Sequence, residues 1–168
     1  MITKTTDIQA IRSVAINVAP EAVEPFIDDV EKQDVIPVIG AELYLKIDAN
    51  PSDAKYKEIL HGGTYTDCCG IQKYSRGLIA AVAYLAYSRL LTFGDIQYTA
   101  FGSVLKNTQY SQKPAEVEKI RAADAAKKMG FAILQTVADY VKVNFDASCC
   151  NPNRVSRPKF ISIKKDRI

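Results

Sequence analysis

The chain has 168 residues and a formal net charge of +3 at pH 7. This length fits one domain that is large enough to bury a substantial core. The first residues, MITKTTDIQ, contain no apolar run, so the sequence does not predict a secretory signal peptide. Many aliphatic residues and alanines, no tryptophan and only eight glycines favour a mainly helical protein.

Charge is divided unevenly along the chain. Residues 1–72 hold 6 Lys/Arg against 12 Asp/Glu, a net −6, whereas residues 73–168 hold 16 against 7, a net +9. A charged face is usually no more than a solvated face. The division would also suit a protein whose acidic side meets the basic side of another copy.

Short helices are expected over the first third of the chain. The pattern Thr6-Asp7-Ile8-Gln9 resembles a capping box and predicts a first helix through Val14, broken at Asn17–Pro20. A second helix should begin near Pro20, with Pro25 tolerated only in its first turn. Its apolar residues are predicted to face the core and its charged ones solvent: Phe26, Ile27, Val30 and Val35 inside; Asp28, Asp29, Glu31, Lys32 and Asp34 outside.

Two further helices are expected before residue 62. Pro37 should end the second helix and start a third, in which Ile39, Leu43, Tyr44 and Ile47 keep helical spacing. After a turn at residues 48–51, Ser52 is predicted to cap a short fourth helix. The single histidine, His61, has no carboxylate pair or cysteine at ligand spacing, so it is interpreted as a helix C-terminal residue. Residues 64–70 are predicted to form a loop.

The stretch from Tyr74 to Phe93 is the most apolar part of the sequence. It has no charge between Gly77 and Tyr87, and Gly94 provides a stop signal. A helix that is apolar on all sides belongs in a protein core or in a membrane. Arg76 and Arg89 bracket only twelve residues, whereas a membrane span needs about 20. The sequence therefore predicts a buried central helix.

A β-hairpin and a long helix are expected after Gly94. Residues 96–101 and 104–108 are β-prone, with Gly102-Ser103 between them. We expect this hairpin to make contacts between molecules, because one helical bundle cannot cover its alternating residues. The residues assigned to this contact are Tyr98, Thr99, Phe101, Val104 and Leu105. The long helix should run from Pro114 to about Asn144 and bury Ile120, Ala126, Ile133, Val137 and Tyr140.

The four cysteines form two adjacent pairs, Cys68-Cys69 and Cys149-Cys150. Adjacent cysteines are poorly placed to bond each other, and zinc ligands prefer wider spacing. Reduced thiols are expected, with a cross-pair disulfide or a four-thiolate site as alternatives. No metal or cofactor is predicted. No nucleotide-binding, hydrolase or metalloprotease motif is present in the sequence, so no enzymatic activity is predicted.

The chain divides into a helical domain, residues 1–146, and an extended basic arm, residues 147–168. Residues 154–168 carry a net charge of +5, interleaved with apolar side chains. Pro152 and Pro158 should keep the arm extended. We expect it to dock on a neighbouring protein. The residues assigned to this docking are Arg154, Arg157, Lys159, Phe160, Ile161, Ile163, Lys164 and Lys165.

Several motifs occur in an order that resembles a known family. The segment Ile36-Pro37-Val38-Ile39-Gly40, followed by Leu43-Tyr44, resembles the P-L-I-G-x-x-L-Y segment of head–tail connector proteins of tailed phages. Further motifs follow in order: Gly62-Gly63-Thr64-Tyr65, the helix from Gly77 to Tyr84, Arg89, Phe101-Gly102 and Tyr110-Ser111. Over roughly residues 20–143, the set is similar to the connector, or ring, proteins of crAss-like phages.

This resemblance implies a mainly α structural protein: a helical bundle around the central helix, with one protruding hairpin and the extended arm. It implies a ring, commonly of twelve copies, that lies below the portal at the head–tail junction of the virion. Such a ring extends the DNA channel and docks tail components. The implied partners are further copies, the portal and other tail or ring proteins, with genomic DNA nearby, no membrane, and assembly in the host cytoplasm.

Two alternatives remain open. The basic arm could make the protein a sequence-independent DNA-binding module, whose affinity would fall steeply with salt. The cysteines could instead form an enzymatic site that matches none of the common catalytic motifs.

Overall fold

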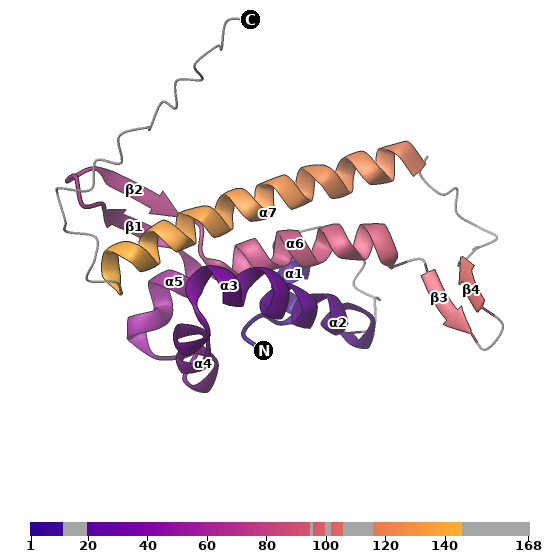
Figure 1. Cartoon of the computed structure of the whole chain (residues 1–168), viewed down its shortest axis with the longest axis horizontal. Helices are drawn as coiled ribbons and strands as arrows, with labels where there is room; N and C mark the ends of the chain where they lie inside the picture. Colours follow the sequence, from indigo (N-terminus) through magenta and orange to yellow (C-terminus); the bar gives the residue numbers. More distant parts are fainter. Residues whose placement is uncertain (12–19, 95, 100–101, 106–115, 146–168) are drawn as a thin grey trace, which may run out of the picture.

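Helix α6, Leu78–Phe93, lies at the centre of the protein (Figure 1). The computed structural model describes residues 1–11, 20–94, 96–99, 102–105 and 116–145. All seven residues from Ala80 to Ala86 are buried, which confirms the predicted central helix. Its start is shaped by a close backbone crossing: a Cβ on Gly77, where φ is +90°, would lie 2.5 Å from the backbone nitrogen of Gly62. Only glycine fits there.

Helix α7, Glu116–Asn144, runs alongside α6 (Figure 1). Small residues form its buried line over the first half, and a Cβ on Gly130 would lie 2.6 Å from Cγ of Leu85. Ala126, Ile133, Val137 and Tyr140 are buried as predicted. Ile120 is 55% exposed, so its predicted burial was wrong. The buried line at this level instead passes through Ala123, on a different side of the helix.

The N-terminal helices α1, Thr5–Ile11, and α2, Pro20–Val30, also pack on α6. Ile8 and Ile27 are fully buried. Pro25 lies inside α2, beyond its first turn, whereas it was predicted to be tolerated only in the first turn. Residues 12–14, predicted to continue the first helix, lie outside the described residues.

Glu31 differs most from its predicted environment. It was expected to face solvent, but its side chain is only 1% exposed. Helix α2 passes directly into a π-helical turn, η1 (Glu31–Val35), which adds a residue to the turn and changes which positions face inward. The carboxylate accepts hydrogen bonds from the backbone nitrogens of Ile2 and Thr3 and from the Tyr44 hydroxyl, at 2.7–3.1 Å. These donors compensate for its burial.

The predicted third helix is two helices, α3 (Ile36–Ile39) and α4 (Ala41–Ala49). They are divided at Gly40, whose φ of +86° a helix cannot continue through. A 3₁₀ turn, η2 (Ala54–Tyr56), and helix α5 (Lys57–His61) follow. Asp53, rather than Ser52, is the cap, because its Oδ1 accepts from the Lys55 nitrogen at 3.0 Å. His61 is exposed in the last turn of α5, where it was predicted.

Two antiparallel hairpins complete the described fold. Strands β1 (Gly63–Thr66) and β2 (Gln72–Ser75) pair where a loop was predicted. The loop prediction was wrong here because each strand has only four residues, and the turn between them is held by hydrogen bonds to the Asp67 side chain. Strands β3 (Ile96–Thr99) and β4 (Gly102–Leu105) form the one hairpin that was predicted, which projects beyond the end of α6 (Figure 1). Gly102 and Ser103 lie in β4, so the predicted turn position was wrong by two residues.

The described residues therefore form a mainly helical bundle around a buried central helix, which confirms the predicted fold class. Two small hairpins are present rather than one. The predicted arm, residues 147–168, lies outside the described residues. Among the described helices, none has the length and apolar character needed to cross a membrane.

Candidate interaction surfaces

The first set of predicted contact residues lies on the β3–β4 hairpin. Tyr98 pairs with Ser103 and Thr99 with Gly102, while Val104 and Leu105 pair with Gln97 and Ile96. Phe101 lies outside the described residues, as do all eight residues assigned to the arm. The structure thus places four of the thirteen predicted contact residues, all on one hairpin at the end of the bundle (Figure 1).

A surface that the sequence reasoning missed runs along α7. Val117, Ile120 and Phe131 are 57%, 55% and 41% exposed, and their spacing places them on one side of the helix. We call these three residues the α7 stripe. Phe93, at the end of α6, is 54% exposed nearby, across a shared cavity from Phe131. The spacing of these apolar residues, which is distinct from that of Ala123, Ala126 and Gly130, was the available signal.

The cavity beside the α7 stripe has a volume of about 350 Å³. It lies between η1, α6 and α7, and Phe93, Phe131 and Lys127 are among its lining residues. An ion pair also lines it: Nη2 of Arg89 lies 2.7 Å from Oδ2 of Asp34, and Nη1 lies 4.0 Å from Asp29. Apolar rings next to charged groups are typical of the edge of a protein–protein contact.

Unpaired charges of opposite sign lie on two different helices. Arg121, Lys127 and Lys128 of α7 are exposed and form no ion pair with another described residue. Helix α2 carries four carboxylates and no basic residue. Asp28 pairs with Lys32 at 2.7 Å, whereas Glu21 and Glu24 are exposed and unpaired among the described residues. The uneven charge of the sequence therefore appears on separate elements.

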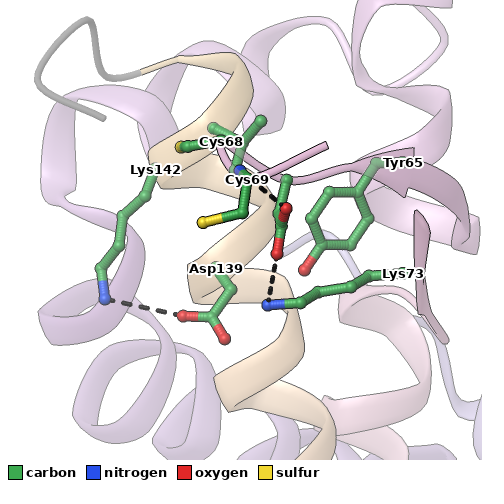
Figure 2. A pocket seen from close by; sticks show the side chains of 8 residues that line it. Tyr65, Cys68, Cys69, Lys73, Asp139 and Lys142 are labelled. Carbon is green, nitrogen blue, oxygen red and sulfur yellow. Dashed lines mark hydrogen bonds and ion pairs between the residues drawn. The ribbon is translucent and has the colours of Figure 1, made fainter. Parts of the chain in front are cut away.

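A second cavity, of about 250 Å³, lies between the β1–β2 turn and the end of α7 (Figure 2). Asp67 organises the turn: its Oδ1 accepts from the backbone nitrogens of Cys69 and Ile71, each at 2.9 Å. Its Oδ2 lies 3.1 Å from Nζ of Lys73. The hydrogen bond from Ile71, together with those from Lys73 and Cys69, lowers the pKa of the Asp67 carboxyl.

The charges of this second cavity are paired. Lys73 with Asp67 and Lys142 with Asp139 are visible as two ion pairs (Figure 2). Within the described ranges, no group of three or more His, Cys, Asp or Glu side chains could hold a metal ion. The arrangement can fasten the turn against α7, and it leaves no described charge in the cavity without an opposite partner.

The cysteines depart from the prediction of reduced thiols. Cys69 is free and exposed, but Cys68 is disulfide-bonded. The tertiary structure brings the turn that carries Cys68 beside the C-terminal end of α7 (Figure 2). That proximity could not be seen from the sequence, in which these segments are far apart.

Residues 35–157 match the model of a family of unknown function, DUF6712. The chain belongs to the DUF6712 family. No curated protein and no solved structure matches this DUF6712 chain. The family description carries no activity, so the function must be argued from the surfaces themselves.

Proposed function

We propose that this DUF6712 protein is a structural subunit of a phage virion, which assembles with copies of itself into a ring at the head–tail junction. The observation that carries the proposal is the exposed α7 stripe, which lies beside unpaired basic residues while unpaired acidic residues lie on α2. Such surfaces suit a subunit that is completed by neighbours. The order of motifs, which resembles that of phage connector proteins, supports the same function.

One motif of the resemblance has a structural reason in this fold. Pro37 lies in the first turn of α3, and Gly40 adopts a positive φ between α3 and α4. A proline followed by a glycine at this separation therefore starts one short helix and separates it from the next. Pro37 and Gly40 are thus explained by the backbone conformation alone. The motif supports the proposal only because it occurs in the same order as the other motifs shared with the connector proteins.

In this role the ring lies below the portal, extends the DNA channel and provides a docking surface for tail or further ring proteins. Twelve copies are proposed from the resemblance. The protein needs no catalytic activity for this role. It belongs in the virion after assembly in the host cytoplasm.

The direct test is electron microscopy of the purified full-length protein, alone and mixed with its candidate portal. The proposal expects closed rings, or rings that form on the portal, and a matching mass by mass photometry. A protein that stays monomeric up to high concentration and does not bind the portal would contradict the proposal.

DNA binding by the arm is the second candidate, favoured by the net charge of +5 over residues 154–168. Two variants separate it from docking. Deletion of residues 154–168 removes both charge and apolar side chains. Substitution of Phe160, Ile161 and Ile163 by serine keeps the charge. Docking predicts that both variants lose attachment to the portal or the adjoining ring. DNA binding predicts that only the deletion loses affinity for duplex DNA, and that this affinity falls steeply with salt.

A further inference from the structure

The α7 stripe has the composition of one half of a protein contact. Its apolar residues, Val117, Ile120 and Phe131, are exposed in the same part of the helix as Arg121, Lys127 and Lys128. Burying the three apolar side chains would stabilise an assembly, because it removes apolar surface from water. The exposed Asp124 also lies on this side of α7, but Arg121, Lys127 and Lys128 have no ion-pair partner among the described residues, and carboxylates on the other half would pair with them. The stripe therefore favours an acidic partner that also has apolar surface.

The outer face of α2 has the composition of the other half. Glu21 and Glu24 are exposed and unpaired among the described residues, with the exposed Ala22 and Pro25 beside them. The opposite side of α2 is anchored in the core by Val23, Ile27 and Val30. We call Glu21, Ala22, Glu24 and Pro25 the α2 face. Its four residues are all exposed.

We infer that the α7 stripe of one copy binds the α2 face of a second copy. The inference rests on the proposed function and names the surfaces through which the subunits of that ring meet. The second copy is the occupant because the chain itself carries complementary charge: α2 holds four carboxylates and no basic residue, whereas four basic residues and three acidic ones lie between Glu116 and Phe131. Because the two surfaces are different, the contact is head-to-tail, and contacts of this type form rings when they close.

Charge reversal tests this contact. The α7 variant carries Lys127→Glu and Lys128→Glu, and the α2 variant carries Glu21→Lys and Glu24→Lys. In each variant, like charges face each other in every contact. We expect each to weaken self-association by about tenfold or more, because opposed like charges are costly. Analytical ultracentrifugation over a range of concentrations measures this.

Recombining the changes distinguishes a real contact from damage to the fold. The chain that carries all four substitutions again has opposite charges in every contact, so its self-association should recover. An equimolar mixture of the two single-surface variants should also recover, with alternating copies, while each alone does not. The matched control is Lys4→Glu with Lys57→Glu, which changes the net charge by −4, as the α7 variant does, at exposed positions that belong to neither surface. It should associate like the wild type.

The outcomes separate the inference from the function on which it rests. Recovery in the mixture and in the four-fold variant supports the contact. If the wild type assembles but neither reversal weakens it, the contact is wrong while the ring remains. If the wild type does not self-associate either alone or on the portal, the proposed function fails and the contact fails with it.

Discussion

Glu31 joins parts of the chain that are far apart in sequence. Its carboxylate accepts two backbone hydrogen bonds from the N-terminal segment and one from the hydroxyl of Tyr44 on α4. All of these partners are N–H or O–H donors, which is what a buried carboxylate needs. Glu31 thereby links the N-terminal segment to α2 and α4, and the Met1 amino group adds an ion pair with Asp48 of α4 at 2.6 Å.

Glu31→Gln should lower the free energy of unfolding by about 2 kcal/mol. The substitution removes the charge and leaves one of the donors facing an NH₂ group that cannot accept its hydrogen bond. Urea unfolding followed by circular dichroism measures the change. The control is Glu118→Gln at an exposed position of α7 that belongs to neither proposed surface, where we expect about 1 kcal/mol or less. Equal effects of the two substitutions would show that the buried carboxylate has no special role.

Tyr140 should make stability depend on pH in the alkaline range. Its hydroxyl donates a hydrogen bond to Oε2 of Glu58 at 2.9 Å. Burial of the phenol is the larger cause and this hydrogen bond the smaller cause that together raise the pKa of Tyr140 to about 12. In the unfolded chain the pKa is about 10. The folded state therefore favours the neutral phenol, whose stabilising contribution is complete below pH 10 and is lost as the pH rises through 12. The unfolding free energies of the wild type and of Tyr140→Phe should therefore approach each other between pH 10 and pH 12. A difference between the two free energies that stays constant over this pH range would contradict the prediction.

At the scale of secondary structure, α6 and α7 pack closely against each other. Gly130 allows the two helices to approach, and the Ser88 hydroxyl donates to the Ala123 carbonyl at 2.8 Å. Side chains on this seam have no room to move toward solvent, because residues 80–86 of α6 are buried on all sides. Charge on α6 should therefore be far more costly than charge on the outer side of α7.

Ala83→Asp in α6 should destabilise the fold by several kcal/mol, because it buries a carboxylate without a partner. Ala132→Asp on the exposed side of α7 is the matched control and should cost about 0.7 kcal/mol, the difference in helix propensity. Thermal melting of both variants compares them. A melting temperature of the Ala83 variant equal to that of the control would show that α6 is not the core.

At the scale of the whole molecule, covalent linkage adds to packing. Cys68 is disulfide-bonded and Cys69 is free, although the two residues are adjacent and both exposed. Under oxidising conditions, Cys68→Ser should lower the free energy of unfolding by about 2–4 kcal/mol through the loss of the cross-link. Cys69→Ser should leave it nearly unchanged. A reductant should bring the wild type to the level of the Cys68 variant, and identical stability of both variants without reductant would contradict the assignment.

The sequence by itself determined the elements whose signals are local. The uncharged stretch from Gly77 to Tyr87 had to form a buried helix, because no side of it could face water. Periodicity likewise predicted most of the buried side of α7, and the β-prone residues after Gly94 predicted the β3–β4 hairpin. In each case the deciding interactions lie within a few residues along the chain.

Only the tertiary structure decided the features that depend on distant partners. The sequence pattern predicts that Glu31 lies on the surface. In the folded protein its carboxylate is buried and accepts hydrogen bonds from the N–H groups of residues 2 and 3 and from the Tyr44 hydroxyl. Ile120 has helical spacing with other apolar residues, yet the close approach of α6 at Ala123 and Gly130 leaves it exposed. The disulfide bond at Cys68 likewise depends on which segments lie side by side in the folded chain. Burial and pairing are settled by which segments meet in space, and no periodicity along the chain encodes that.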